Sequence, residues 1–268
     1  MATKRILLDV GGTFIKRADG QMFPIDSNGD SQAIAGQLAA AIDSLEGVSG
    51  IGVAIPGPFD FEKGVFLMKH KYASVYGKSF RELVNIPERV QLVFHHDVNA
   101  VLLGAINMLS LQRKNTALVT LGTGLGFAYA LNGQVQYAPS GSPARSLWNL
   151  PVEEGVILED LVSARGICQA YARLTGSTDE TAHSISMKAY DGDKIAREVY
   201  ENVGAYLGQA IGEAIGDLNV STVLIGGQIA QSFSLMEASL RQSLEGIHVR
   251  RTPFGAVFEG LSSLFKTQ

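Results

Sequence analysis

Short apolar runs alternate with longer amphipathic segments along the chain. Apolar runs of a few residues bounded by Gly, Pro or Asp are typical of strands, and apolar residues spaced three or four apart predict helices. The pattern predicts strands at 5–10, 14–17, 51–55, 89–94, 117–121, 126–131 and 222–225, and helices at 31–45, 97–109, 163–174, 193–218, 231–244 and 255–265. Residues 64–79 have no clear period and are interpreted as a loop over a site.

A strand, a glycine-rich turn and a second strand occur twice, at residues 5–17 and 117–131. The two copies read Leu-Leu-Asp-Val-Gly-Gly-Thr and Leu-Val-Thr-Leu-Gly-Thr-Gly. This weak internal duplication predicts two α/β lobes that face each other, with both turns at the mouth between them. We expect an N-terminal lobe at 1–110, onto which a C-terminal helix at about 254–268 packs back, and a C-terminal lobe at 111–253.

Composition narrows the possible functions. The 268 residues are 46% hydrophobic and 18% charged, with a net charge of −4, which excludes a disordered chain and disfavours nucleic-acid binding. The single cysteine, Cys168, excludes an intrachain disulfide framework and a multi-cysteine zinc site. No apolar run approaches the ~20 residues of a membrane span, and the first residues do not resemble a signal peptide. We therefore expect a cytoplasmic protein.

The chain has 30 glycines, and their positions bear on three kinds of phosphate-binding loop. The ending of a Walker loop occurs at 77–79, but Tyr72 stands where its first glycine belongs. A dinucleotide fingerprint fails at 122–127, because Phe127 replaces its third glycine. The third kind is a pair of β-hairpins whose glycine-containing turns would present backbone amides and threonine hydroxyls to an anion. Either turn alone fits an ordinary hairpin; two matched turns, with Asp9 before the first, favour phosphate binding.

Five motifs occur in the order seen in ROK-family sugar kinases of the actin/hexokinase/Hsp70 superfamily, and the chain resembles that family over nearly its whole length. The motifs are Asp9-Val10-Gly11-Gly12-Thr13, Pro56-Gly57-Pro58, Asp97-Val98-Asn99-Ala100, Leu121-Gly122-Thr123-Gly124-Leu125-Gly126 and Ile225-Gly226-Gly227. The resemblance implies a two-lobe actin-like (ribonuclease H-like) fold. The repressor branch of the family carries an N-terminal helix-turn-helix segment, for which the position of Asp9 leaves no room, so the kinase branch is expected.

The resemblance also implies roles for individual residues. Asp9 would hold Mg²⁺, through water, and Asp97 would be the general base, so Mg²⁺ and ATP are the expected cofactor and co-substrate. From sequence position alone, Asp97 could equally be a helix N-cap and Asp9 a turn-starting residue. The expected phosphate loops are Gly11, Gly12 and Thr13, then Gly122, Thr123 and Gly124, and the expected adenosine loop is Gly226 and Gly227.

The sugar side departs from the family pattern. The usual Glu-x-Gly-His falls at about 142–145, where neither the Glu nor the His is present, and the cysteines of the zinc loop are absent, so no structural zinc is expected. Arg145 either faces the sugar, where it would suit a carboxylate or phosphate on the acceptor, or turns to solvent. His96 stands where the family has Asn. The expected sugar contacts are Gly57, His96, Asp97, Ser142, Arg145 and Glu159.

These observations predict ATP- and Mg²⁺-dependent phosphorylation of a monosaccharide hydroxyl, with Asp97 accepting the hydroxyl proton. Two alternatives stay open. One is a polyphosphate-dependent glucokinase-like enzyme, since zinc-free members of the resembled family include such enzymes. The other is a catalytically weak sugar-sensing protein that keeps the kinase fold. The expected partners are the sugar and ATP, without nucleic acid or membrane, and a homodimer is the family expectation.

Overall fold

The computed structural model describes residues 4–265 and divides the chain into two compact units. Unit 1 takes in the chain up to Ser110, the segment Tyr137–Ala144 and the chain from Pro253 onward. Unit 2 comprises Leu111–Gln136 and Arg145–Thr252. The segment 137–144 groups with unit 1, whereas the sequence analysis placed it in the C-terminal lobe.

Unit 1 is built on a five-stranded sheet with the order β3-β2-β1-β4-β7. The first three strands form an antiparallel meander, and β4 and β7 run parallel to β1. Along β1, Leu8 packs into the core that includes α1, whereas Leu7 packs against α9 on the opposite face. The elements are β1 Lys4–Val10, β2 Phe14–Arg17, β3 Met22–Pro24, α1 Ser31–Ile42, β4 Val48–Ile55, β5 Phe59–Asp60, β6 Val65–Phe66, η1 Ala73–Val75, α2 Phe80–Leu83, β7 Gln91–His96, α3 Asp97–Met108 and α9 Ala256–Ser263.

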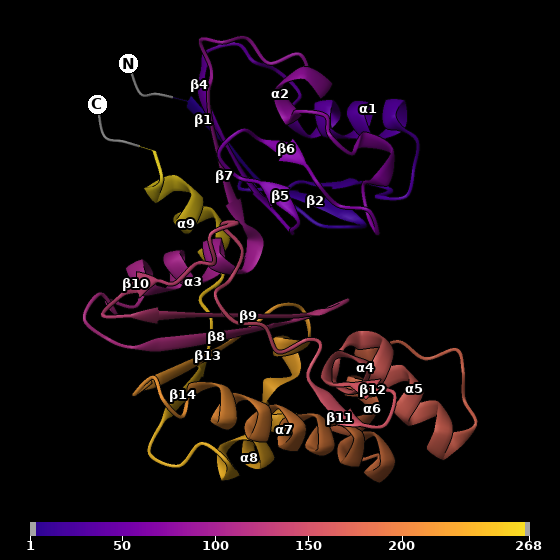
Figure 1. Cartoon of the computed structure of the whole chain (residues 1–268). Helices are drawn as coiled ribbons and strands as arrows, with labels where there is room; N and C mark the ends of the chain where they lie inside the picture. The colour runs from indigo at the N-terminus through magenta and orange to yellow at the C-terminus, as the bar shows by residue number, and fades with distance from the viewer. Residues whose placement is uncertain (1–3, 266–268) are drawn as a thin grey trace. The chain divides into compact units, whose positions relative to one another are not determined.

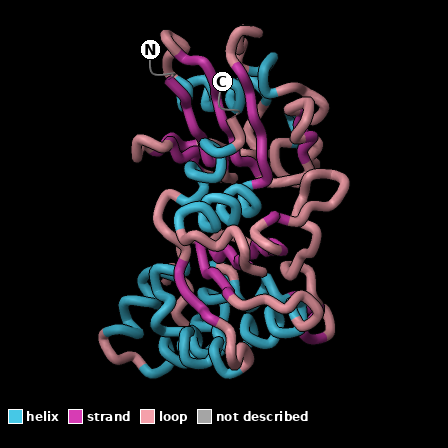
Figure 2. The backbone as a smooth tube through the Cα atoms, turned by 90° about the vertical axis from the view of Figure 1, so that its left-hand side faces the viewer, coloured by secondary structure: helices cyan, strands magenta, loops and turns pink. Residues whose placement is uncertain are grey.

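Unit 2 repeats this plan with the order β10-β9-β8-β13-β14. Both units combine strands with helices (Figure 2). It again has an antiparallel meander followed by two strands parallel to the first, which confirms the internal duplication. Its elements are β8 Thr116–Leu121, β9 Leu125–Leu131, β10 Gln134–Val135, β11 Pro151–Glu153, β12 Val156–Ile157, α4 Leu158–Val162, α5 Ala164–Thr175, α6 Ala182–Tyr190, α7 Lys194–Ile215, β13 Thr222–Gly226, η2 Ile229–Ser232, α8 Phe233–Gln242 and β14 His248–Arg251.

Local sequence explains several of these boundaries. Strand β4 is buried along almost its whole length, as expected of a central strand with parallel neighbours. Asn132 and Gly133 both have positive φ, 48° and 75°, the pair of values that a two-residue hairpin turn of type I′ requires. Helix α7 begins after Asp193, whose side chain caps it by accepting from the Ala196 amide at 3.0 Å.

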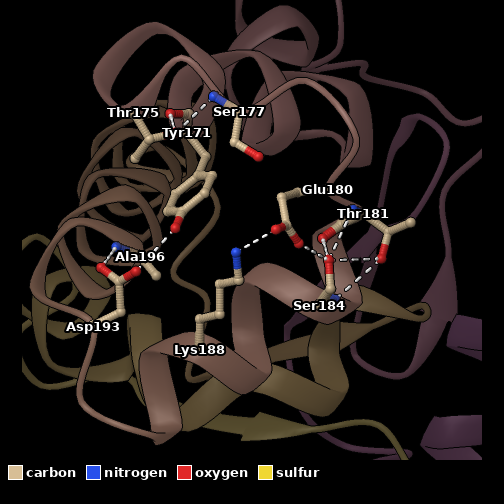
Figure 3. Close-up of polar contacts among 9 residues, drawn as sticks. All are labelled: Tyr171, Thr175, Ser177, Glu180, Thr181, Ser184, Lys188, Asp193 and Ala196. Carbon is tan, nitrogen blue, oxygen red and sulfur yellow. Dashed lines mark hydrogen bonds and ion pairs between the residues drawn. The ribbon is translucent and has the colours of Figure 1, made fainter.

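Polar contacts hold α5, α6 and α7 together in unit 2 (Figure 3). Tyr171 on α5 donates its hydroxyl to Asp193 Oδ2, at the start of α7, over 2.9 Å. Lys188 on α6 pairs with Glu180, and its ammonium lies 5.3 Å from the ring centre of Tyr171. Ser184 donates to the other carboxylate oxygen of Glu180 at 2.6 Å. The contacts of Tyr171 join α5 to α6 and to the start of α7, whereas those of Glu180 fix the beginning of α6.

The C-terminal helix α9 packs on α3 in unit 1 (Figure 1). Glycines allow the two backbones to touch: a Cβ on Gly104 of α3 would lie 1.8 Å from the carbonyl oxygen of Ala256, and one on Gly260 of α9 would lie 2.0 Å from that of Ala100. Side chains larger than hydrogen cannot be accommodated at this crossing without moving a helix.

We expect Gly104→Ala to lower the free energy of unfolding by about 1–3 kcal/mol or more, because the added methyl group forces α9 away from α3. Gly36→Ala on α1 is the matched control. A Cβ there meets no described atom within 4 Å, so that change should be neutral or stabilising by about 0.5–1 kcal/mol. Urea unfolding of the two variants measures the difference; equal stabilities would contradict the close α3–α9 crossing.

Among residues 4–265, no helix is both long enough and apolar enough to cross a membrane.

Candidate functional site

The first glycine turn joins β1 to β2 in unit 1. Its carbonyl groups are engaged: Gly12 accepts from the Ser27 amide at 3.3 Å, and Thr13 accepts from the Ile25 amide at 2.9 Å. The Gly11 amide closes the turn by donating to Phe14 at 3.0 Å. The amides of Gly12 and Thr13, in contrast, form no hydrogen bond to another residue of the described chain, and Thr13 is exposed. This is the arrangement that an anion-binding turn needs.

Asp9 lies just before this turn and pairs in register with Lys16 of β2. The two side chains form a loose ion pair, with 3.6 Å between Oδ2 and Nζ. Burial raises the pKa of Asp9, the charge of Lys16 opposes this, and the negative charge of Asp97 raises it further. Two carboxylates that disfavour each other's charge suit a hard divalent cation, which relieves the repulsion, so the donor chemistry fits Mg²⁺.

Asp97 begins α3 at the end of β7. The N-cap of the helix is His96, and Asp97 is its first residue, so the interpretation of Asp97 as the N-cap is not correct. Its Oδ1 accepts from the Val98 amide at 2.7 Å and lies 2.8 Å from Nδ1 of His96. Burial alone would raise the pKa of Asp97, but His96, the Val98 amide and the charge of Lys71 together lower it. Asp97 is therefore an ionised carboxylate that can accept a proton.

Four of the expected sugar contacts converge within unit 1. A Cβ on Gly57 would lie 3.3 Å from Oγ of Ser142 and 3.5 Å from Cδ2 of His96, which itself contacts Asp97. Ser142 reaches this place because the segment 137–144 is docked on unit 1, where Asn99 of α3 donates to the Gly141 carbonyl at 3.3 Å. Gly57, His96, Asp97 and Ser142 thus lie together.

His95 fixes the other end of that segment. Its Nε2 lies 3.3 Å from the hydroxyl of Tyr137, and the two rings are 5.4 Å apart. Its Nδ1 accepts from the His96 amide at 3.1 Å. Burial, together with the neighbouring His96, lowers the pKa of His95 to about 4, so the ring is neutral at physiological pH. The two adjacent histidines have separate tasks, since His95 contacts Tyr137 and His96 contacts Asp97. No local sequence pattern indicates that Tyr137 is the partner of His95.

The second glycine turn joins β8 to β9 in unit 2, and Glu159 lies against it. Oε2 of Glu159 accepts from the Leu125 amide at 2.8 Å, and a Cβ on Gly124 would lie 2.9 Å from the same oxygen. The Gly122 amide donates to the Gly124 carbonyl at 3.0 Å, whereas the amides of Thr123 and Gly124 have no hydrogen-bond partner within residues 4–265. Glu159, expected from the resemblance as a sugar contact, thus has a role in holding the turn that the sequence did not suggest.

Gly226 and Gly227 end β13, and the protein's own packing requires them. Gly227 has φ +84°, and a Cβ there would lie 2.2 Å from the carbonyl oxygen of Leu121. A Cβ on Gly226 would lie 2.9 Å from Oγ1 of Thr252. The contact with Leu121 therefore accounts for Gly227, and the contact with Thr252 favours a small residue at Gly226, while their assignment to an adenosine loop stays a prediction.

The side chain of Arg145 forms a partly exposed ion pair within unit 2. Its two terminal nitrogens bind both carboxylate oxygens of Asp217, at 2.7 and 2.6 Å, and one of them also donates to the Ala214 carbonyl. The guanidinium also lies 5.4 Å from the ring centre of Tyr129. This ion pair lowers the pKa of Asp217. These bonds occupy donors of Arg145 within unit 2, and its assignment as a sugar contact stays a prediction.

Comparisons with known proteins agree with this architecture. The model of the ROK family matches residues 28–146 and 151–258. A glucokinase of Halalkalibacterium halodurans is 25% identical, and the match covers 94% of this chain and 88% of that protein. The DNA-binding transcriptional repressor Mlc of Escherichia coli is 23% identical over 74% of this chain and 54% of its own length.

The crystal structure of a ROK family glucokinase from Streptomyces griseus, in complex with glucose and AMPPNP, superposes with a TM-score of 0.81 at 18% identity, covering 97% of this chain and 98% of that one. The actin-like α/β fold is thereby confirmed.

Proposed function

Because the chain belongs to the ROK family, we propose that it is a sugar kinase, which transfers a phosphoryl group from ATP to a hydroxyl of a monosaccharide. The observation that carries the proposal is the ionised Asp97 beside His96, Gly57 and Ser142. A hydroxyl bound among these residues would place its proton within reach of a carboxylate that is free to take it. The glucokinase relative supports the same reaction class.

The residues of the two units have distinct proposed tasks. In unit 1, Asp97 accepts the proton of the attacking hydroxyl, and His96 orients the carboxylate through its 2.8 Å contact. Asp9 would hold hydrated Mg²⁺, which would supply charge neutralisation for the phosphates. The free amides of Gly12 and Thr13, and in unit 2 those of Thr123 and Gly124, donate to phosphate oxygens.

An ADP-release assay over a panel of neutral, acidic and phosphorylated sugars tests this proposal, with polyphosphate as a second donor. We expect turnover with ATP and Mg²⁺ for at least one sugar. Turnover with polyphosphate but not with ATP would show that polyphosphate is the phosphoryl donor, and the reaction would still be phosphorylation of a sugar. Absence of turnover with every sugar and both donors would contradict the proposal.

A sugar-sensing protein is the second candidate, favoured by the repressor among the relatives and by Ser142 in place of a family carboxylate. Such a protein would bind a sugar without releasing ADP. Calorimetric titration with the same panel separates it from the kinase.

Arg145→Ala and Asp217→Ala are expected to lower the melting temperature by similar amounts, because each removes the same ion pair. Neither should change the KM of the sugar acceptor by more than about twofold, since Asp217 and the Ala214 carbonyl occupy the Arg145 donors. Melting curves and acceptor kinetics of both variants measure this. A large rise in KM for Arg145→Ala alone would return Arg145 to the sugar site.

A further inference from the structure

The side chain of Lys71 lies along the first phosphate turn. A Cβ built on Gly12 would be 3.7 Å from both Cδ and Cε of Lys71, so the end of the lysine stem packs against this glycine. The ammonium is one bond beyond Cε, and the residue is half-buried. A cation is therefore placed at the rim of the turn whose amides, at Gly12 and Thr13, have no hydrogen-bond partner within residues 4–265.

Tyr72 fixes Lys71 in this position. Its side chain is fully buried, and its hydroxyl donates to the carbonyl of Gly11 in the turn itself. Its amide donates to the Ser27 carbonyl at 2.6 Å, and its backbone has φ +55°. The residue that follows Lys71 is thus bound to the turn by both its backbone and its side chain, which keeps the lysine over Gly12.

The ammonium of Lys71 forms no ion pair with another described residue and could therefore bind an anionic ligand. Within residues 4–265, no carboxylate oxygen lies within 4.0 Å of its Nζ, whereas Lys16 on the neighbouring strand is paired with Asp9. Lys71 nevertheless acts on Asp97, because its charge is one of the influences that lower the pKa of that carboxylate. The ammonium accordingly lies within electrostatic reach of both the phosphate turn and the proposed base.

We propose that Lys71 is a catalytic residue that binds the phosphoryl group during its transfer, which rests on the kinase function proposed above. The hydroxyl oxygen of the acceptor bonds to the γ-phosphorus as the bond from that phosphorus to the oxygen bridging to the β-phosphate breaks. The hydroxyl proton goes to Asp97, and ADP leaves. Lys71 donates hydrogen bonds to the oxygens of the moving group, whose charge it offsets.

Lys71 could bind either an acidic group on the acceptor or the phosphoryl group of the donor, and the position of its side-chain stem favours the second. An acidic group on the acceptor would also attract a lysine, and the sugar contacts Gly57, His96 and Ser142 lie in the same unit. Lys71, however, packs on Gly12 of the phosphate turn, which points to the phosphoryl group of the donor. A contact with the acceptor alone is an outcome that the experiment detects.

Lys71→Met tests the proposal, because methionine keeps the apolar stem against Gly12 and removes the charge. Lys69→Met is the matched control: Lys69 is exposed and lies 5.4 Å from the ring centre of Tyr76. The affinities of both variants for Mg-AMPPNP and Mg-ADP are measured by calorimetry without acceptor. We expect Lys71→Met to weaken AMPPNP binding by about tenfold and to leave ADP binding within about twofold, because only AMPPNP has a γ-phosphate. Lys69→Met should change neither.

Turnover supplies the second measurement. Lys71→Met should lower kcat by about 10²-fold and leave the KM of the acceptor nearly unchanged. Equal losses for AMPPNP and ADP, or a loss confined to the KM of an acidic acceptor, would overturn the role in phosphoryl transfer while leaving the kinase proposal intact. If the unaltered protein binds AMPPNP and releases no ADP with any sugar, the kinase proposal fails and the assignment of Lys71 as catalytic fails with it.

Discussion

Asp97→Asn should lower kcat by about 10²–10⁴-fold, the range that removal of a general base typically produces. The amide is the same size as the carboxylate, and its oxygen can still accept from the Val98 amide, which Asp97 now binds at 2.7 Å. It cannot take a proton from the sugar hydroxyl. Affinity for Mg-AMPPNP should stay within about twofold, since Asp97 contributes to the chemical step and little to nucleotide binding. Steady-state kinetics and calorimetry measure the two effects.

Asp30→Asn is the control for this prediction. Asp30 caps α1 by accepting from the Ala33 amide at 2.8 Å, and asparagine is an equally good cap, so kcat and melting temperature should both be retained. If Asp97→Asn also keeps most of its kcat, then Asp97 only supports the first turn of α3, and the proton must be accepted by another group.

Hydrophobic periodicity predicts most strands of the two sheets and the long helices of both units. Expected helix 97–109 is α3 Asp97–Met108, and expected strand 117–121 is β8 Thr116–Leu121. Expected strand 89–94 begins two residues later, as β7 Gln91–His96. The elements that were missed are short or weakly patterned, such as α6 Ala182–Tyr190 and β14 His248–Arg251. Strand β14 has one buried residue, and its pairing with β13 is what makes it a strand.

The candidate site was less predictable, because its decisive contacts join residues that are far apart in the chain. The partner of Arg145 is Asp217, and no local pattern indicates that the two meet. The same holds for Glu159 and the Leu125 amide, and for Tyr72 and the Gly11 carbonyl. Motifs identify the residue types at the turns; only the packed fold shows which donors are already occupied.

Asp9→Asn should impair activity and at the same time stabilise the protein without nucleotide. Activity should fall by about 10–100-fold, which is typical when a residue that binds a metal through water is removed, and more Mg²⁺ should be needed for half-maximal turnover. Stability should rise because burial and Asp97 disfavour the charge of Asp9, which the amide does not carry. Asp19→Asn, at an exposed residue paired with Arg17, is the control and should leave kcat unchanged.

The gain in stability should depend on pH, and its direction follows from the raised pKa of Asp9 in the folded protein. Well below the ordinary Asp pKa of about 3.9, the carboxyl group is protonated in both the folded and the unfolded chain, so the two proteins should melt increasingly alike toward the acid end of the range. As the pH rises above this value, the unfolded chain loses the proton more readily than the folded one, which lowers the stability of the unaltered protein relative to Asp9→Asn. The difference reaches its full size above the folded pKa and should be present at pH 7. Melting curves of both proteins between pH 4 and pH 8, recorded without Mg²⁺, measure it; an Asn variant that melts lower at pH 7 would show that the ion pair with Lys16 outweighs the cost of burying Asp9.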